Sequence, residues 1–108
     1  MKNIIAIILF TFSTSSFAVY NANMKGVVNT LAVYTDGDYI YIQLENQPSS
    51  HPSCNPTFFV VTGSVPIDRR QMIMSRLSMA FATKEEINIG YDSQGDCADG
   101  YIRLHRVG

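Results

Sequence analysis

The sequence contains no tryptophan, only two cysteines, and a small share of charged side chains, 16%. Its eight basic and nine acidic residues leave a formal net charge of -1, so it lacks the basic excess typical of proteins that bind nucleic acid or anionic membranes. The missing tryptophan removes a side chain that often stacks on sugar rings. What remains is 46% apolar over 108 residues, a composition typical of one small folded domain rather than a disordered chain.

The apolar run near the N-terminus, residues 4–10, is much shorter than the roughly 20 residues that a membrane-spanning helix needs. Lys2 precedes the run, and small residues follow it up to Ala18, which is the layout of a cleaved secretory signal peptide. The sequence therefore predicts a signal peptide over residues 1–18 and a single mature domain over residues 19–108. The mature chain is expected to be secreted or periplasmic without membrane insertion, and a membrane anchor is the alternative.

Cys54 and Cys97 are the only cysteines, and an even pair in an exported protein predicts a disulfide. The bond would close a loop of about 40 residues, which removes about 3 to 4 kcal/mol of denatured-state freedom in the chain-entropy model. A metal-binding thiol pair is disfavoured because the chain has neither a CxxC spacing nor a His-rich cluster nearby.

Two β-rich runs, residues 26–34 and 39–44, flank the dipeptide Asp36-Gly37. This pattern predicts a β-hairpin. In the second strand, one face is expected to carry the core residues Ile40, Ile42 and Leu44.

Residues 45–56 contain three prolines among polar side chains, so we expect a loop, because proline cannot continue a strand ladder. The apolar run at residues 57–62 then predicts a third, well-buried strand.

A helix is predicted over residues 69–83, with Asp68 as its N-cap, Gln71 completing a capping box, and a hydrophobic staple between Ile67 and Met72. Side chains on its core face are expected to recur at helical spacing: Ile73, Leu77, Ala80 and Phe81. Three methionines lie at the flanks, either as adaptable core filler or as an oligomer contact: Met72, Met74 and Met79.

Two further strands are predicted at residues 87–91 and 101–107, separated by a polar turn region at residues 92–100. Three strands, a helix and two strands is the element order of an OB-fold, a five-stranded and partly open barrel. The expected fold class is thus mainly β with one helix and OB-fold-like, and the alternative is a small sheet with one helix packed on a face.

Several of these features occur together: the signal peptide, a hairpin with Tyr34, Tyr39 and Tyr41, a cysteine pair near the last strand, and a single amphipathic helix. In this combination the chain resembles small secreted bacterial OB-fold proteins, among them the receptor-binding (B) subunits of AB-type toxins. The resemblance implies a homo-oligomer, since those subunits form rings of five that bind surface glycans. In several of them the single helix lines the central pore.

Catalytic motifs are scarce, because the chain has no GxSxG, HExxH or glycine-rich phosphate loop. The best enzyme hypothesis is a small secreted hydrolase or nuclease with His105 as general acid or base and Arg103 or Arg106 holding a phosphate. The acidic residues Asp92 and Asp96 imitate a calcium loop, but Cys97 stands where its glycine should be. We therefore expect no enzyme activity, metal or cofactor.

One polar face remains as a candidate binding surface. Alternation turns six side chains away from the core: Tyr39, Tyr41, Gln43, Tyr101, Arg103 and His105. Tyrosine rings beside polar groups suit a glycan or a protein partner, although exposed tyrosines also simply favour strands. The sequence thus predicts a non-enzymatic binding module, with a periplasmic inhibitor or immunity-type protein that uses residues 45–56 as the alternative.

Overall fold

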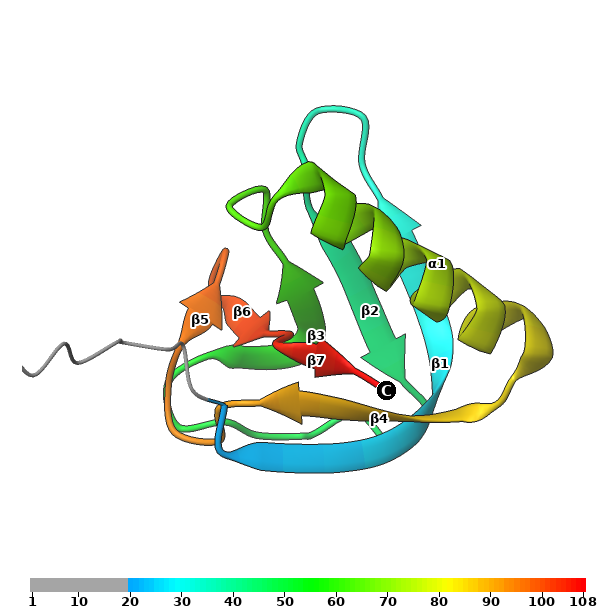
Figure 1. The fold of residues 1–108 in the computed structure, drawn as a ribbon. Helices are drawn as coiled ribbons and strands as arrows, with labels where there is room; N and C mark the ends of the chain where they lie inside the picture. Colours follow the sequence, from blue (N-terminus) through cyan, green and yellow to red (C-terminus); the bar gives the residue numbers. More distant parts are fainter. Residues whose placement is uncertain (1–19) are drawn as a thin grey trace, which may run out of the picture.

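The computed structural model describes residues 20–108, so the predicted signal peptide, residues 1–18, lies outside the described residues. The described chain is mainly β, with one helix and a seven-stranded mixed sheet that curls through 230° into an open half-barrel (Figure 1). The elements are β1 Ala22–Val33, β2 Ile40–Leu44, β3 Asn55–Val61, α1 Ile67–Thr83, β4 Glu86–Tyr91, β5 Cys97–Ala98, β6 Tyr101–Arg103 and β7 Arg106–Val107. Across the sheet their order is β5-β6-β3-β2-β1-β4-β7.

Strand β1 belongs to both halves of the sheet. Its first half pairs antiparallel with β4, from Ala22 to Val27, and its second half pairs antiparallel with β2. The register with β2 is interrupted between Val28 and Thr30, and an irregularity of this kind bends a strand and increases its twist. The long, bent β1 therefore lets the sheet curl instead of staying flat.

The predicted hairpin is confirmed, because β1 and β2 are antiparallel neighbours with Val33 opposite Ile40 and the Asp36-Gly37 dipeptide in the loop between them. The first strand begins at Ala22 rather than at residue 26. The predicted inner face of β2 is also confirmed, since its three apolar side chains are at most 5% exposed: Ile40, Ile42 and Leu44.

The prediction of one strand over residues 101–107 is wrong, because that segment is divided into β6, parallel to β3, and β7, antiparallel to β4. Between them the backbone N–H of Leu104 donates to the carbonyl of Val60, and that of His105 donates to the carbonyl of Gly90. The segment thus changes partner midway, which a single regular strand cannot do.

A second hairpin, β5–β6, turns at Asp99 and Gly100, whose φ angles are 53° and 82°. Asp-Gly at two left-handed positions is the preferred chemistry of such a turn. The sequence analysis placed only a polar turn region here, so the sheet has seven strands in place of the expected five.

Helix α1 packs against β1 and β7 (Figure 1) and begins two residues earlier than predicted. Pro66 is its N-cap residue, without a side-chain capping bond, so the assignment of Asp68 as N-cap is wrong. Asp68 instead lies in the first turn, where a carboxylate favours the helix dipole. The helix ends at Thr83 as predicted, because Lys84 adopts the left-handed conformation with φ 57°.

The core face of α1 is narrower than predicted. Leu77 and Ala80 are fully buried and Ile73 packs against the core, whereas Phe81 is 40% exposed and its core assignment is wrong. Of the flanking methionines, Met74 packs against the core, and the other two are largely exposed, Met72 and Met79.

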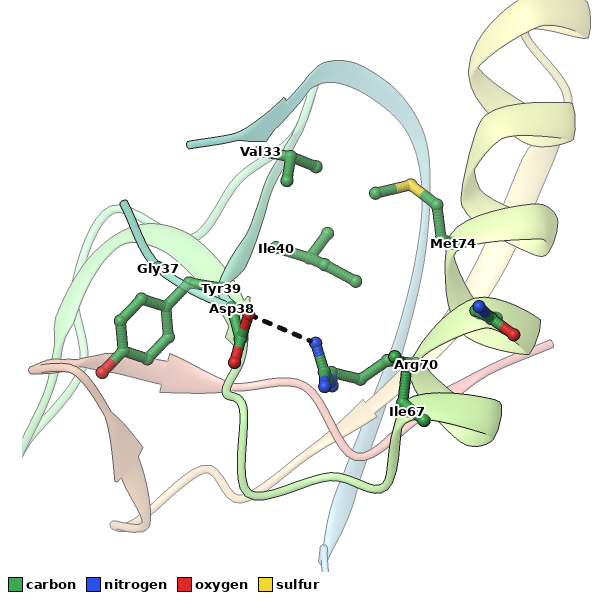
Figure 2. Close-up of a pocket in the computed structure, with 9 residues that line it drawn as sticks. Val33, Gly37, Asp38, Tyr39, Ile40, Ile67, Arg70 and Met74 are labelled. Atoms are coloured by element: carbon green, nitrogen blue, oxygen red, sulfur yellow. Dashed lines mark ion pairs between the residues drawn. The ribbon is translucent and has the colours of Figure 1, made fainter. Parts of the chain in front are cut away.

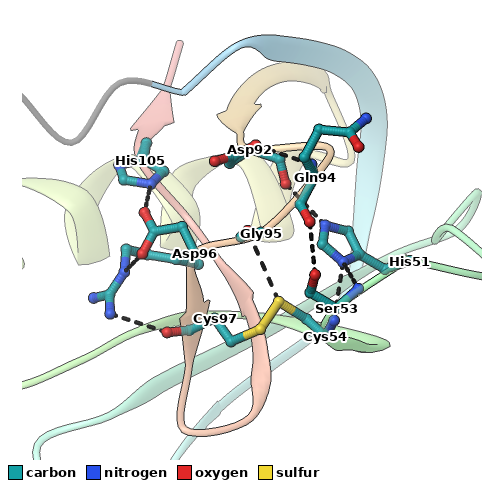
Figure 3. Close-up of a disulfide and its surroundings, with 10 residues drawn as sticks. His51, Ser53, Cys54, Asp92, Gln94, Gly95, Asp96, Cys97 and His105 are labelled. Atoms are coloured by element: carbon teal, nitrogen blue, oxygen red, sulfur yellow. Dashed lines mark hydrogen bonds and ion pairs between the residues drawn. A yellow bond between two sulfur atoms is a disulfide. The ribbon is translucent and has the colours of Figure 1, made fainter.

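The predicted disulfide is present between Cys54 and Cys97, with Cα atoms 5.5 Å apart across a sequence separation of 43 residues (Figure 3). It ties the loop that precedes β3 to the first residue of β5. Beside it the His51 ring fixes the loop, because Nε2 donates to the carbonyl of Asp92 and Nδ1 accepts the backbone N–H groups of Ser53 and Cys54.

Candidate functional site

Tyrosine and phenylalanine rings from two strands and one loop gather around Tyr41 of β2. Its ring centroid lies 5.2 Å from that of Tyr34, 6.2 Å from Tyr39, and 5.8 Å from both Phe58 and Tyr101. All of these pairs meet edge to face, the arrangement that aromatic pairs favour. We call Tyr34, Tyr39, Tyr41, Phe58 and Tyr101 the aromatic cluster.

The strand register explains why the cluster forms. Tyr41 of β2 is opposite Val60 of β3, and Val60 is opposite Arg103 of β6. Residues paired across strands share one face of a sheet, so this face is the side away from Ile40 and Ile42. The sequence therefore predicted the face of β2 correctly but could not show that β3 would lie between the two tyrosine-bearing strands.

Phe58 and Tyr34 are the members of the cluster that the sequence analysis did not place among the binding residues, and Tyr34 was noted only as a hairpin tyrosine. Phe58 stands in the apolar run that predicted a well-buried third strand, and Phe59 and Val61 are indeed buried in the core. Phe58 is only half-buried, and its ring lies 5.5 Å from that of Tyr101. Strand alternation against Phe59 was the available signal, but an uninterrupted apolar run hides it.

The hydroxyl of Tyr41 donates a hydrogen bond of 2.6 Å to Oδ2 of Asp99 in the β5–β6 turn. This bond raises the pKa of Tyr41 to about 12, and burial and the negative charge of Asp99 act in the same direction. The central ring of the cluster is thereby fixed at both its edge and its hydroxyl.

Gln43 lies one strand position further along the same face of β2. Its Nε2 donates to the carbonyl of Thr57 at 3.2 Å, and its Oε1 accepts from the hydroxyl of Thr30 at 3.4 Å. The amide therefore links β1, β2 and β3, and only part of its hydrogen-bonding capacity is free for a ligand.

Arg103 and His105 form a separate polar group with Asp96. Arg103 Nε lies 2.9 Å from one carboxylate oxygen of Asp96. His105 Nε2 lies 2.5 Å from the other oxygen, and Figure 3 shows this pair. Burial would raise the pKa of the Asp96 carboxyl, but the hydrogen bonds from these two partners hold it below its usual value. Asp96 thus carries a negative charge that Arg103 balances, and its other oxygen bonds to His105.

The six predicted binding residues therefore divide into two groups. The structure brings three of them together in the aromatic cluster, where the rings of Tyr39 and Tyr101 both contact that of Tyr41. Gln43 lies beside them. Arg103 shares their sheet face through its register but directs its guanidinium to Asp96, and His105 lies beyond the break that follows β6. Asp96, which the sequence analysis considered only as part of a rejected calcium loop, joins these last two.

An Asp–His pair can orient an imidazole for proton transfer. In residues 20–108, however, no hydroxyl or thiol forms a hydrogen bond with the His105 ring, whose Nε2 is taken by Asp96 and whose face stacks on Tyr20 at 6.0 Å. In these residues the pair links His105, which precedes β7, to Asp96, which precedes β5.

A small pocket of about 240 Å³ lies between the β1–β2 loop and α1. Figure 2 shows Val33 and Ile40 facing Met74 across it, with Arg70 and Asp38 at its edge in a 3.9 Å ion pair. The lining is mostly apolar, so this pocket suits a single apolar side chain better than a polar ligand.

The loop at residues 45–56 is held down rather than projecting freely. Gln47 donates to the carbonyl of Pro56, Asn46 donates to that of Lys25, and His51 and the disulfide fix the second half. The part of the chain that the structure describes contains no helix with the length and apolar character to cross a membrane. Over the same residues, no three His, Cys, Asp or Glu side chains come together in a way that could hold a metal ion.

Comparison of the chain with models of known protein families, with curated proteins and with solved structures gives no match. The function is therefore argued from the geometry of the site itself.

Proposed function

We propose that this protein is a non-enzymatic binding module of the secretory compartment that recognises its ligand, a glycan in the first instance, through the aromatic cluster. The observation that carries the proposal is the gathering of Tyr34, Tyr39, Phe58 and Tyr101 around Tyr41 on the outer face of the sheet. Aromatic rings are costly to leave half-exposed on a small domain, and such patches usually mark a binding surface.

The physical properties of the cluster support recognition. Its rings offer apolar faces and edges, and the tyrosine hydroxyls and Gln43 offer polar groups that orient a ligand. The edge-to-face contacts and the bond from Tyr41 to Asp99 fix the central rings before a ligand arrives. A surface that is already ordered loses little conformational entropy on binding. Tyr34 is 57% exposed, so one ring at the margin is open to solvent.

The fold supports the same proposal. The half-barrel has its helix between β3 and β4, a bent β1 that pairs with both β2 and β4, and a C-terminal segment that bonds to both β3 and β4. These features suit an OB-fold, whose outer surface commonly binds oligosaccharides or oligonucleotides. The disulfide supports export to an oxidising compartment. Together they are compatible with the resemblance to receptor-binding subunits of AB-type toxins.

A glycan array probed with the exported protein tests the proposal. Tyr101→Ala and Tyr39→Ala should each weaken binding by about 1 to 3 kcal/mol, because aromatic anchors dominate such surfaces. Phe81→Ala is the matched control, since Phe81 is a 40% exposed ring on α1 outside the cluster. Its binding should equal that of the unmodified chain.

The same array separates the alternatives. Equal binding by the unmodified chain and its three variants would show that the aromatic cluster does not bind the glycan. If no glycan is bound and a hydrolase copurifies from the periplasm, the inhibitor or immunity-type role replaces the glycan-binding role. Circular dichroism of every variant must match that of the unmodified chain for the comparison to count.

A further inference from the structure

A second cavity, separate from the aromatic cluster, opens between the first turns of α1 and the C-terminal segment. It is a groove of about 1080 Å³. Its walls carry three arginines, one each from α1, β6 and β7: Arg69, Arg103 and Arg106. Nothing in the binding role proposed above uses this groove.

The charge of the groove is positive. Arg103 is balanced by Asp96, while in residues 20–108 no ion pair or hydrogen bond engages the guanidinium of Arg69 or that of Arg106. Three arginines against the two lining carboxylates, Asp68 and Asp96, leave a formal charge of +1 with His105 neutral. Arg69 of α1 and Arg106 of β7 both line the groove, and two guanidinium groups without an ion pair suit a single anionic group.

The floor of the groove is apolar, and this restricts the kind of anion. Val65, Ile73 and Leu104 line it, together with Met72, whose side chain is 72% exposed. A small inorganic ion would leave these side chains facing water, whereas an apolar body would cover them. Met72 is flexible and adapts to ligands of different shape.

We propose that this groove binds an organic anion with an apolar body, whose carboxylate or phosphate group lies between Arg69 and Arg106. The ion pair of Asp96 with Arg103 and His105 positions the strand wall without adding a free negative charge. The first turn of α1 borders the groove, and its backbone N–H groups add to the same preference for an anion. The site is independent of the aromatic cluster.

The test is a titration of the isotopically labelled mature protein with four probes, followed by the amide resonances of Val65, Ile73 and Leu104. The probes are phenyl phosphate, benzoate, benzyl alcohol and inorganic phosphate. Phenyl phosphate or benzoate should bind, and whichever binds more tightly identifies the head group. Benzyl alcohol lacks the charge and inorganic phosphate lacks the apolar body, so both should bind more weakly.

Two charge-removing variants locate the site. Arg69→Gln and Arg106→Gln should each weaken binding of the anionic probe by about tenfold, the loss expected for one charge-assisted contact. Lys25→Gln removes the same charge from an exposed position on β1 and should leave binding unchanged, as should Tyr101→Ala.

Several outcomes would overturn the proposal. They are failure of both aromatic anions to bind, equal binding of inorganic phosphate, or equal weakening by Lys25→Gln. Loss of binding in Tyr101→Ala would move the anion to the aromatic cluster instead. The glycan array uses different ligands, and only Tyr101→Ala is common to both experiments. It should weaken glycan binding and leave binding of the anionic probe unchanged, so failure of either proposal leaves the other intact.

Discussion

Tyr41 lies at the centre of the aromatic cluster on the outer face of the sheet. Its ring contacts four other rings, and its hydroxyl reaches Asp99 in a turn 58 residues away in sequence. Asp99 is held in the left-handed conformation, φ 53°, at the first position of the Asp-Gly turn. A backbone requirement of the turn therefore places the acceptor that orients the tyrosine.

The first prediction concerns the titration of this tyrosine. Tyr41 should ionise near pH 12 rather than 10.0, because its neutral form donates to the Asp99 carboxylate. Asp99→Asn should return the pKa of Tyr41 towards 10.0. Ultraviolet titration of tyrosinate measures both, with Asp92→Asn as a control for removing an acidic residue elsewhere.

The sign of the stability change follows from the raised pKa. The contribution of the Tyr41–Asp99 bond to folding is fully present below pH 10.0, the value expected in the unfolded chain, and is lost as pH rises through about 12. Near neutral pH, the free energy of unfolding measured in urea should therefore not change through ionisation of Tyr41. A Tyr41 that ionises at its ordinary pKa would mean that the bond does not form in solution.

At the scale of an element, helix α1 buries only a few of its apolar side chains and exposes the others. Leu77 and Ala80 are 0% exposed, whereas Ile67, Met72 and Met79 are each more than 60% exposed. The apolar residues are thus distributed around the helix rather than along one stripe. Periodicity predicted a wider buried face, because it counts apolar residues without knowing how much of the helix circumference the sheet covers.

The second prediction separates the two faces of α1. Leu77→Ala should lower the free energy of unfolding by about 2 to 5 kcal/mol, since it leaves a cavity in the core. Phe81→Ala removes a larger side chain but should cost about 1 kcal/mol or less, because Phe81 is 40% exposed. Chemical denaturation measures both. A cost for Phe81→Ala equal to that for Leu77→Ala would contradict the observed orientation of the helix.

At the scale of the whole molecule, two long-range links hold the ends of the curled sheet. The segment from Tyr101 to Val107 pairs first with β3 and then with β4, which lie on different sides of β1 and β2 in the sheet order. The Cys54–Cys97 bond fastens β5 to the loop before β3. A domain of this size gains much of its stability from such links, because its core is small.

The third prediction concerns the disulfide. Replacing both cysteines, Cys54→Ala with Cys97→Ala, should lower the free energy of unfolding by about 3 to 4 kcal/mol, mainly by freeing the unfolded chain. Mass spectrometry of the protein isolated under non-reducing conditions should give a mass about two units below that of the reduced chain, with no thiol to label. Labelling of both cysteines in unreduced, denatured protein would contradict the bond. The native mass of the same sample reports whether copies of the chain associate.

The sequence alone determined the parts of this protein that depend on neighbouring residues. Alternation identified the buried face of β2, Asp36-Gly37 marked the hairpin, and helical spacing located α1 to within two residues at its start. The paired cysteines were sufficient to predict the disulfide, since the chain offers no other partner. These features arise from local backbone preference and from the two periods of side-chain direction.

Only the tertiary structure decided which distant residues meet. Strand order inserts β3 between β2 and β6, which brings Phe58 into the aromatic cluster beside Tyr41 and Tyr101. The change of partner after Arg103 takes His105 out of that face and gives it Asp96 instead. Both outcomes depend on long-range strand pairing and on the curl of the sheet, and side-chain periodicity carries no information about either.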